Sequence, residues 1–541
     1  MPPVTLSALI ALPLLGGVLA WLVGRHDESA ARWAALGGAI ATFALSLTLW
    51  FTVGDAAAAS ATPVLEQRAA WIPSLGVEYH LALDGLNLLF VVLSGLLGCI
   101  AVLVSWREIE RAPGLHYLCV LATLSGIMGV FLAFDLFLFY FFWELMLVPM
   151  YFLIGIWGHE RRVAAAIKFV IFTMASSLLL LVAIIGLYYA HAQANGVFTT
   201  DYLELLGTPL EASTAQWLFL GFFVAFAVKL PLFPFHGWLP DAHTQAPTAG
   251  SVLLAGLLLK TGGYGLIRFA VPLFPGAAAS LAGPIAVVGV IGIIYGAVLA
   301  YRQTDMKRLI AYTSVSHMGF VVLAVAAWSL TSLQGAVVLM LAHGLATGAL
   351  FAIAGMIHAR LQTRELSALG GLWARLPRLS GFALLFVLAS VGVPGMGNFI
   401  GEFLALLGSF PAAPGLVAVA VIGIVLGTVA MLELMQRVFH GPSRSLLALA
   451  DLDRRELLLL GVLALLVLVL GLYPQPALDS SRSTLAELVA HDVRYEPADP
   501  ELMRGRRRTA MLAEEGPEPR AVEKGNEKEA SGLAGGGSRR P

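Results

Sequence analysis

Six charged side chains stand inside long apolar stretches of the chain, where a charge is costly. A charged residue at the centre of a membrane-spanning helix costs about 2.5–3.5 kcal/mol on insertion scales, so each is a functional candidate. Carboxylates and ammonium groups both exchange protons, and the chemistry that they favour here is proton transfer within a membrane. The six residues are Glu144, Lys168, Lys229, Lys260, Glu402 and Glu433.

Most of these groups are expected near the middle of the bilayer. Counted at about 1.5 Å per residue from the nearest polar helix end, several lie roughly 12–13.5 Å deep. A hydrocarbon core is about 30 Å thick, so these are midplane positions. Two histidines fall at a similar depth. We therefore predict a row of titratable groups parallel to the membrane, made of Glu144, Lys229, Lys260, His317, His343 and Glu402.

A carboxylate and a lysine can form a proton switch. A lysine in surroundings of low dielectric constant releases its proton more readily, and a nearby carboxylate holds that proton in place. A change in the distance between the two groups therefore moves a proton. Glu144 and Lys229 suit this switch, and Glu402 suits the far end of the row. The candidate relays between them are Lys260, His317 and His343. The alternative for the charged groups of the row is a structural ion pair within the membrane. These groups are Glu144, Lys229, Lys260 and Glu402.

Two of the six charges have an ordinary explanation. Lys168 is five residues past Val163, close to the basic side of its helix, and we expect its ammonium group to reach the interface. Glu433 precedes Arg437 by four residues, which places both on one helical face and favours a local ion pair. Neither residue is assigned to the row.

Fourteen apolar segments of about 20 residues could position these groups, so the predicted fold is an all-α multi-pass membrane protein. They begin near Val4, Ala31, Leu81, Leu115, Leu136, Val163, Ala215, Pro247, Ala279, Leu309, Ser332, Ser380, Gly415 and Leu457. Two segments contain helix-breaking residues in mid-membrane: KLPLFP at 229–234 in the seventh, and VPGMG at 393–397 in the twelfth. Backbone freed at such a break must line a polar cavity or be covered by protein.

Basic residues indicate how the chain is oriented. Cytoplasmic loops carry an excess of Lys and Arg. The loops after spans 1, 3, 5, 9, 11 and 13 hold 17 basic residues, and the opposite face holds only Arg68 and Arg268. We therefore expect both termini outside the cytoplasm. The 17 are Arg25, Arg32, Arg107, Arg111, Arg161, Arg162, Arg302, Lys307, Arg308, Arg360, Arg364, Arg375, Arg378, Arg437, Arg444, Arg454 and Arg455.

Composition excludes several classes of protein. The 541 residues are 58% hydrophobic and 12% charged, with a net charge of −1, so nothing favours a nucleic-acid partner. The two cysteines, Cys99 and Cys119, are too few for a four-cysteine iron–sulfur or zinc site, and no glycine-rich turn fits a nucleotide-binding loop. We expect no redox cofactor, nucleotide or metal in this chain. Residues 476–541 are rich in charge and poor in aromatic residues, and we predict a disordered tail there.

Several motifs together resemble one known family. The stretch KLPLFPFHGWLPDAHTQAPTAGSVLLAGLLLKTGGYG at 229–265 is similar to the signature of the antiporter-like, proton-pumping subunits of respiratory complex I. Among them, the M-type chains of bacterial NADH–quinone oxidoreductase, the counterparts of mitochondrial chain 4, are the most similar. Further matches are FWELMLVPMY at 142–151, WGHERR at 157–162, DMKRLIAYTSVSHMG at 305–319, AHGL at 342–345 and NFIGEF at 398–403. The resemblance covers roughly residues 1–475.

This resemblance implies two inverted five-helix repeats, each with one broken helix. The expected organisation is helices 1–3 at 1–114, the first repeat at 115–270, the second repeat at 278–440 and helix 14 at 456–475. It also implies roles: Glu144 and Lys229 match the family's switch pair, Lys260 its central lysine and Glu402 its terminal group. Four histidines also match family positions, His317 and His343 as relays and, more weakly, His236 and His243.

The resemblance further implies a subunit of a proton-translocating NADH:quinone oxidoreductase in a bacterial inner membrane. Its partners would be other membrane subunits, including two related antiporter-like chains, with FMN, iron–sulfur clusters and quinone held elsewhere in the complex. Two alternatives stay open. One is a subunit of a multisubunit cation/proton antiporter, which shares this charged set and the broken helices, and the other is the membrane arm of a hydrogenase-type complex. The spellings PFHGW at 234–238 and HTQAP at 243–247 favour the oxidoreductase subunit.

Overall fold

The computed structural model describes residues 5–442 and 449–493. Within these residues the chain is almost entirely helical, with one two-stranded antiparallel hairpin. The elements before the first break are α1 Thr5–Val23, α2 Glu28–Ala59, β1 Leu65–Ile72, η1 Pro73–Leu75, β2 Val77–Leu83, α3 Gly85–Val104, α4 Pro113–Leu132, α5 Leu136–Leu145, α6 Leu147–Trp157, α7 Arg162–Asn195, α8 Tyr202–Leu205 and α9 Ala212–Lys229.

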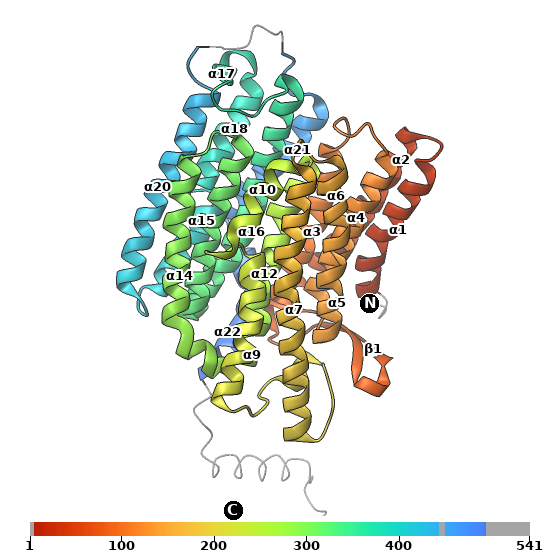
Figure 1. Cartoon of the computed structure of the whole chain (residues 1–541), viewed down its shortest axis with the longest axis vertical. Coiled ribbons are helices and arrows are strands. Elements are labelled where there is room, and N and C mark those ends of the chain that lie inside the picture. The colour runs from red at the N-terminus through yellow and green to blue at the C-terminus, as the bar shows by residue number, and fades with distance from the viewer. Residues whose placement is uncertain (1–4, 443–448, 494–541) are drawn as a thin grey trace, which may run out of the picture. The chain divides into compact units, whose positions relative to one another are not determined.

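The remaining elements follow the first break. They are η2 Phe235–Gly237, α10 Trp238–Gln245, α11 Thr248–Leu253, η3 Leu254–Leu258, α12 Leu259–Gly265, η4 Leu266–Ala270, α13 Val271–Leu273, α14 Pro275–Tyr301, α15 Met306–Ala327, α16 Leu330–Leu361, α17 Leu372–Arg375, α18 Pro377–Ser390, α19 Gly397–Ser409, α20 Pro414–Val438, α21 Arg454–Leu472 and α22 Gln475–Val493. Most helices run side by side along one direction, as Figure 1 shows.

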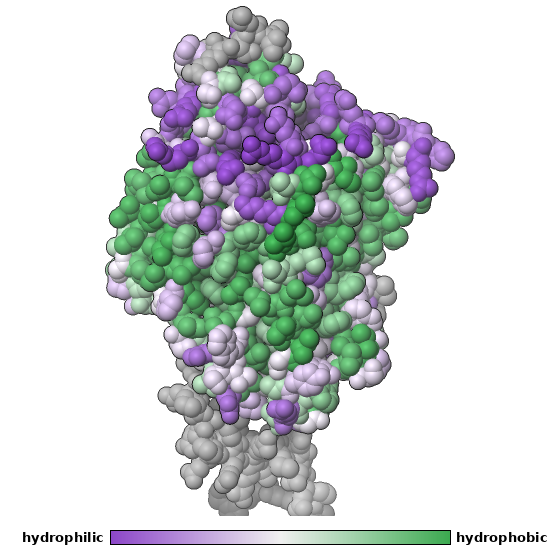
Figure 2. All heavy atoms as spheres, in the orientation of Figure 1, coloured by the Kyte–Doolittle hydropathy of each residue, from purple (hydrophilic) through white to green (hydrophobic). Residues whose placement is uncertain are grey.

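The predicted membrane-spanning segments are helical in the structure. Thirteen helical stretches in the described residues are long and apolar enough to cross a membrane, with α5–α6 and α11–α13 each counted as one. The predicted twelfth span is present as two shorter helices, α18 and α19, separated at residues 391–396. On the face shown in Figure 2, apolar side chains form a broad band with a hydrophilic cap above it. Both predicted breaks, in the seventh and twelfth spans, are confirmed.

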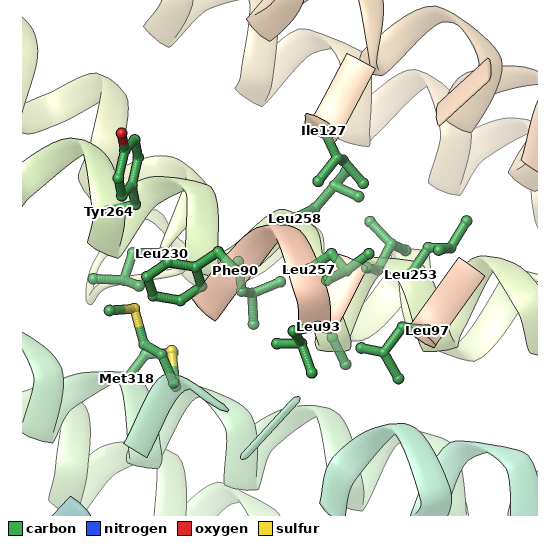
Figure 3. Packing of buried hydrophobic residues seen from close by; sticks show 14 of the residues in the cluster. Phe90, Leu93, Leu97, Ile127, Leu230, Leu253, Leu257, Leu258, Tyr264 and Met318 are labelled. Carbon is green, nitrogen blue, oxygen red and sulfur yellow. The ribbon is translucent and has the colours of Figure 1, made fainter. Parts of the chain in front are cut away.

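The spans that carry Lys260, His317 and His343 lie at the centre of the bundle. The apolar windows of α11–α13 and α16 are 100% buried, whereas that of α20 is 28% buried. Figure 3 shows Phe90, Leu93 and Leu97 of α3 beside Leu257 and Leu258 of η3. Burial of aliphatic and aromatic side chains on all sides of α11–α13 places Lys260 far from lipid and from water. The packed core therefore supplies the low-dielectric surroundings that the proton switch requires.

One predicted boundary is wrong. Residues 475–493 form the helix α22, and the predicted disordered tail therefore begins no earlier than residue 494, which lies outside the described residues. Ala477, Leu485 and Leu488 are buried and recur at helical spacing, so a weakly amphipathic helix packs on α2, α3 and α16. Ser480 also donates to the Gly85 carbonyl at 2.8 Å. The low average hydrophobicity of this segment concealed that apolar face.

Candidate functional site

The first helix break places Lys229 inside the protein. α9 ends at Lys229, and residues 230–234 leave the helix before η2 and α10 begin. The indole Nε1 of Trp238, on α10, returns to the break and donates to the Val228 carbonyl at 2.9 Å. This satisfies a carbonyl that the end of α9 leaves free, as buried backbone requires. The Lys229 side chain is therefore held at a helix end, and the residue is only 1% exposed.

Lys229 and Glu144 are neighbours without being a contact ion pair. The Lys229 Nζ has no hydrogen-bond partner among the described residues and lies 4.9 Å from the ring centroid of Trp143. That distance permits a cation–π interaction. Glu144 is the carboxylate that interacts electrostatically with Lys229, yet the described side chains include no Glu144–Lys229 ion pair within 4.0 Å. The two groups therefore interact without touching, and a change in the distance between them would change the strength of that interaction.

Glu144 faces a groove on the apolar surface of the bundle. The groove has a volume of about 610 Å³ and runs between α5, α6 and α7. Aromatic and aliphatic side chains such as Phe141, Val148 and Ile171 form most of its wall, and Glu144 supplies the one carboxylate of its described lining. One carboxylate oxygen, Oε1, is buried without a hydrogen-bond partner. Glu144 thus stands between Lys229 on one side and a membrane-level surface on the other.

Two π-helical turns flank Lys260. The Leu259 N–H bonds the Leu254 carbonyl at the end of η3, and the Val271 N–H bonds the Leu266 carbonyl at the end of η4. Such turns widen a helix and are frequent at functional sites. The Lys260 Nζ donates to the Ala255 carbonyl, within the first of these turns. Lys260 is completely buried. This bond holds its side-chain nitrogen against the backbone of its own helix.

Lys260, His343, His317 and Glu402 form a continuous buried row. The Lys260 Nζ lies 2.7 Å from the His343 Nδ1, and the rings of His343 and His317 approach with centroids 5.3 Å apart. The His317 Nε2 lies 3.4 Å from the Glu402 Oε1. These residues come from α12, α16, α15 and α19 in that order. The structure therefore places four of the predicted groups next to one another, on four different helices.

The second break shapes the end of this row. α18 ends at Ser390 and α19 begins at Gly397, with Glu402 in the second turn of α19. Gly392 and Gly395 both have positive φ angles, of 71° and 92°, which favour glycine. A Cβ at Gly392 would come within 2.8 Å of the Glu402 Oε2. The broken backbone thus wraps closely around the buried carboxylate, which is 5% exposed.

The two weaker histidine candidates stand beside the row. His243 is completely buried, stacks on Phe351 with centroids 4.4 Å apart, and has no hydrogen-bond partner on either ring nitrogen among the described residues. It interacts electrostatically with Lys260. His236 is packed among aromatic rings, with Tyr295 at 5.0 Å. Neither ring belongs to the row of direct contacts, so their roles stay predictions.

The charges with ordinary explanations are paired near the basic face. Glu433 forms the expected ion pair with Arg437 on α20, which confirms the local interpretation. Lys168 is half-exposed and donates to Asp241 at 2.6 Å, and Arg308 donates to the other oxygen of the same carboxylate at 3.0 Å. Lys168 therefore has a specific partner from α10, which a simple reach to the interface did not predict.

The sequence reasoning misplaced Arg268. It is not in an outer loop: its side chain is 4% exposed, lies in η4 and forms an ion pair with Asp84, whose side chain is 1% exposed. Asp84 also caps the start of α3. The two partners are 184 residues apart, so no local spacing indicates the pair. Ser390 is another buried polar residue beside the row that the sequence reasoning did not single out.

Comparison with known proteins agrees with this architecture. Residues 133–427 match the family described as NADH:quinone oxidoreductase/Mrp antiporter, TM. A curated relative, NADH-quinone oxidoreductase subunit M of Pseudomonas aeruginosa, is 52% identical over 88% of this chain and 96% of its own length. A chain of respiratory complex I from Thermus thermophilus, solved with bound NADH, has a TM-score of 0.81 at 33% identity and covers 90% of this chain and 99% of its own.

A more distant structure shares the fold. A chain of the Mrp complex from Dietzia sp. DQ12-45-1b has a TM-score of 0.78 at 22% identity, covering 90% of this chain and 98% of its own. At that identity the likeness shows the fold alone. The family match spans more than half of the chain, and the curated relative is aligned along nearly its whole length. The chain therefore belongs to the NADH:quinone oxidoreductase/Mrp antiporter transmembrane family, within which it is a member of the NADH-quinone oxidoreductase subunit M group.

Proposed function

We propose that this chain moves protons within the membrane arm of an NADH–quinone oxidoreductase. The observation that carries the proposal is the buried row Lys260, His343, His317 and Glu402, in which every member can bind and release a proton. Lone charges are expensive at this depth, and four titratable groups in contact are difficult to explain as packing. Quinone reduction elsewhere in the complex would supply the free energy.

The pair of Glu144 and Lys229 is proposed as the switch that loads the row. Lys229 is buried and unpartnered among the described residues, and Glu144 is near enough to interact with it but not bonded to it. A shift of the Glu144 side chain toward Lys229 would favour the charged ammonium group, and a shift away would favour release of its proton. No redox centre of this chain takes part in these steps, and FMN, iron–sulfur clusters and quinone are assigned to other subunits.

The proposal includes a location and partners. A chain with this many apolar helices is a multi-pass membrane protein. Its basic residues gather in the loops after spans 1, 3, 5, 9, 11 and 13, which supports an orientation with those loops in the cytoplasm. We place the protein in a bacterial inner membrane with both termini on the outer side. Its partners are other membrane subunits, including two related antiporter-like chains. The groove beside Glu144 and the largely exposed helix α20 are surfaces that such neighbours or lipid would cover.

Glu402→Gln tests the proposed function in the assembled complex. Glutamine keeps the shape of the side chain and cannot take up a proton, so NADH-driven acidification in reconstituted vesicles should fall sharply while the complex stays assembled. The matched control is Glu433→Gln, because Glu433 is a carboxylate on the apolar helix α20 that is paired with Arg437 outside the row. Full proton pumping by a well-assembled Glu402→Gln complex would refute the proposal. Cation exchange without NADH would instead support the antiporter alternative.

A further inference from the structure

A line of polar side chains leads from Lys260 toward the end of the bundle that carries β1 and β2, which we call the hairpin end. Tyr264 and Arg268 follow Lys260 at intervals of four residues, which places the three side chains along one side of α12 and η4. Tyr264 is completely buried, and its ring centroid lies 5.7 Å from the guanidinium carbon of Arg268. The line therefore joins the central lysine to a buried cation.

Polar groups also approach Arg268 from the protein surface. Its guanidinium carbon lies 5.1 Å from the Phe134 ring centroid, and Phe134 packs against His80 with ring centroids 5.7 Å apart. His80 bonds Asp201, and Asp201 forms an ion pair with Arg68, whose side chain is 39% exposed. The Arg268 guanidinium group therefore stands between the central lysine and polar groups that reach the surface at the hairpin end.

Arg268 and its partner Asp84 are unsuited to passing a proton along this line. Arginine stays protonated in proteins and carries only donor groups, so it offers no lone pair to an arriving proton. Arg268 donates to one carboxylate oxygen of Asp84, and the N–H groups of Leu86 and Asn87 donate to the other at 2.9 and 3.0 Å. The pair thus interrupts the line with a fixed positive charge and a carboxylate whose two oxygens are both engaged.

The surroundings hold this pair in place. The side chain of Arg268 is 4% exposed and that of Asp84 is 1% exposed. The rings of Phe134 and Tyr264 both face the guanidinium group, and such cation–π contacts stabilise a cation away from water. The Tyr264 hydroxyl donates to the Phe131 carbonyl at 3.1 Å, so its own proton is directed at the backbone. These contacts fix the pair away from solvent, which a barrier to protons requires.

We propose that the Arg268–Asp84 pair is a proton barrier between Lys260 and the hairpin end, an inference that rests on the proposed function. A proton on Lys260 then moves through the contact with His343, and the pair keeps it from leaving at the hairpin end. For two positive charges about 6 Å apart, which is close to the separation of Arg268 and the Tyr264 ring, an effective dielectric constant of about 20 gives a repulsion equivalent to about 100-fold in proton binding. Asp84 offsets part of this repulsion.

The double variant Arg268→Gln/Asp84→Asn tests the barrier in the assembled complex. It removes both charges and retains two side chains that can form hydrogen bonds, so no unpaired charge is buried. In reconstituted vesicles, fewer protons should accumulate per NADH oxidised. Once NADH is exhausted, the pH gradient should decay at least about tenfold faster than with the unmodified complex, since Asp84 offsets part of the full repulsion. Assembly is checked on a native gel.

Two further variants separate the barrier from a structural role. Arg268→Lys keeps a positive charge beside Asp84 and should restore the slow decay of the gradient. Arg360→Gln/Glu456→Gln is the matched control, because it neutralises another ion pair of low exposure, which joins α16 to α21 at 2.6 Å beside the basic loops. This control should lower the melting temperature of the complex without a proton leak.

Three results would overturn the inference. The first is normal proton accumulation and slow decay of the gradient in an assembled Arg268→Gln/Asp84→Asn complex. The second is an equal leak in Arg360→Gln/Glu456→Gln, which would show that lost stability opens the protein. The third is an equal leak in Arg268→Lys, which would show that the positive charge is not responsible. Normal pumping in Glu402→Gln would instead refute the proposed function, and that variant should not leak.

Discussion

Removal of the Glu144 charge should prevent Lys229 from loading protons into the buried row that ends at Glu402. Glu144→Gln keeps the size of the side chain in the groove but deletes the one carboxylate among the described residues that interacts with Lys229. The two groups do not form a contact pair, and for separations of about 4–8 Å at an effective dielectric constant of about 20, Coulomb's law gives about 2–4 kcal/mol. That energy is equivalent to about 30-fold to 1,000-fold in proton binding.

The consequence is measurable as lost proton pumping. If loading of Lys229 depends on Glu144, NADH-driven acidification by the Glu144→Gln complex in reconstituted vesicles should fall at least about tenfold, below the full Coulomb factor because other steps also limit turnover. NADH oxidation by the peripheral redox centres, assayed with an artificial electron acceptor, should be unchanged. Assembly is checked on a native gel.

Tyr140→Phe is the matched control for this experiment. Tyr140 lines the same groove, one helical turn before Glu144, and its replacement removes a polar group without removing a charge. Tyr140→Phe should therefore pump normally. Unchanged pumping in an assembled Glu144→Gln complex would refute the switch. An equal loss in both variants would show that the groove packing matters and the Glu144 charge does not.

Three further outcomes are expected. Lys229→Ala should depress proton pumping with little loss of assembly, and normal pumping in a well-assembled variant would contradict its role. Arg268→Ala leaves the buried Asp84 carboxylate unpaired and should destabilise the protein by about 3–5 kcal/mol, seen as a lower melting temperature, with partial recovery in Arg268→Ala/Asp84→Asn. Asp201 lies in the loop outside the membrane. Burial raises the pKa of its carboxyl group, but the interactions with His80 outweigh burial and lower the pKa below 3.8. The stabilising effect of Asp201 is complete above pH 3.8 and is lost as the pH falls through the lowered pKa. Hydrogen exchange in the β1–β2 hairpin should therefore rise in acid. The rise should be smaller in Asp201→Asn.

Much of the fold could be predicted because it depends on the transfer of single residues between water and lipid. A stretch of about twenty apolar residues is long enough to cross a membrane. Loops that contain Lys and Arg stay on the cytoplasmic side. The breaks at 229–234 and 393–397 were visible because proline and glycine interrupt a helix by their own geometry. Charged side chains inside apolar segments were also identifiable, because a charge is costly in lipid. They are Glu144, Lys229, Lys260 and Glu402.

The contacts between those charges were decided only by the tertiary structure. Lys260 and His343 are 83 residues apart in the chain and meet at 2.7 Å because α16 packs against α11 and η3, the helical segments that lead into α12. Packing between distant elements also joins Arg268 of η4 to Asp84 at the start of α3. It orders α22 from a segment whose composition predicted disorder. Depth in a membrane is a property of position along one helix, which a sequence records directly. A hydrogen bond depends on the distance between atoms of different helices, and only the packed fold determines that distance.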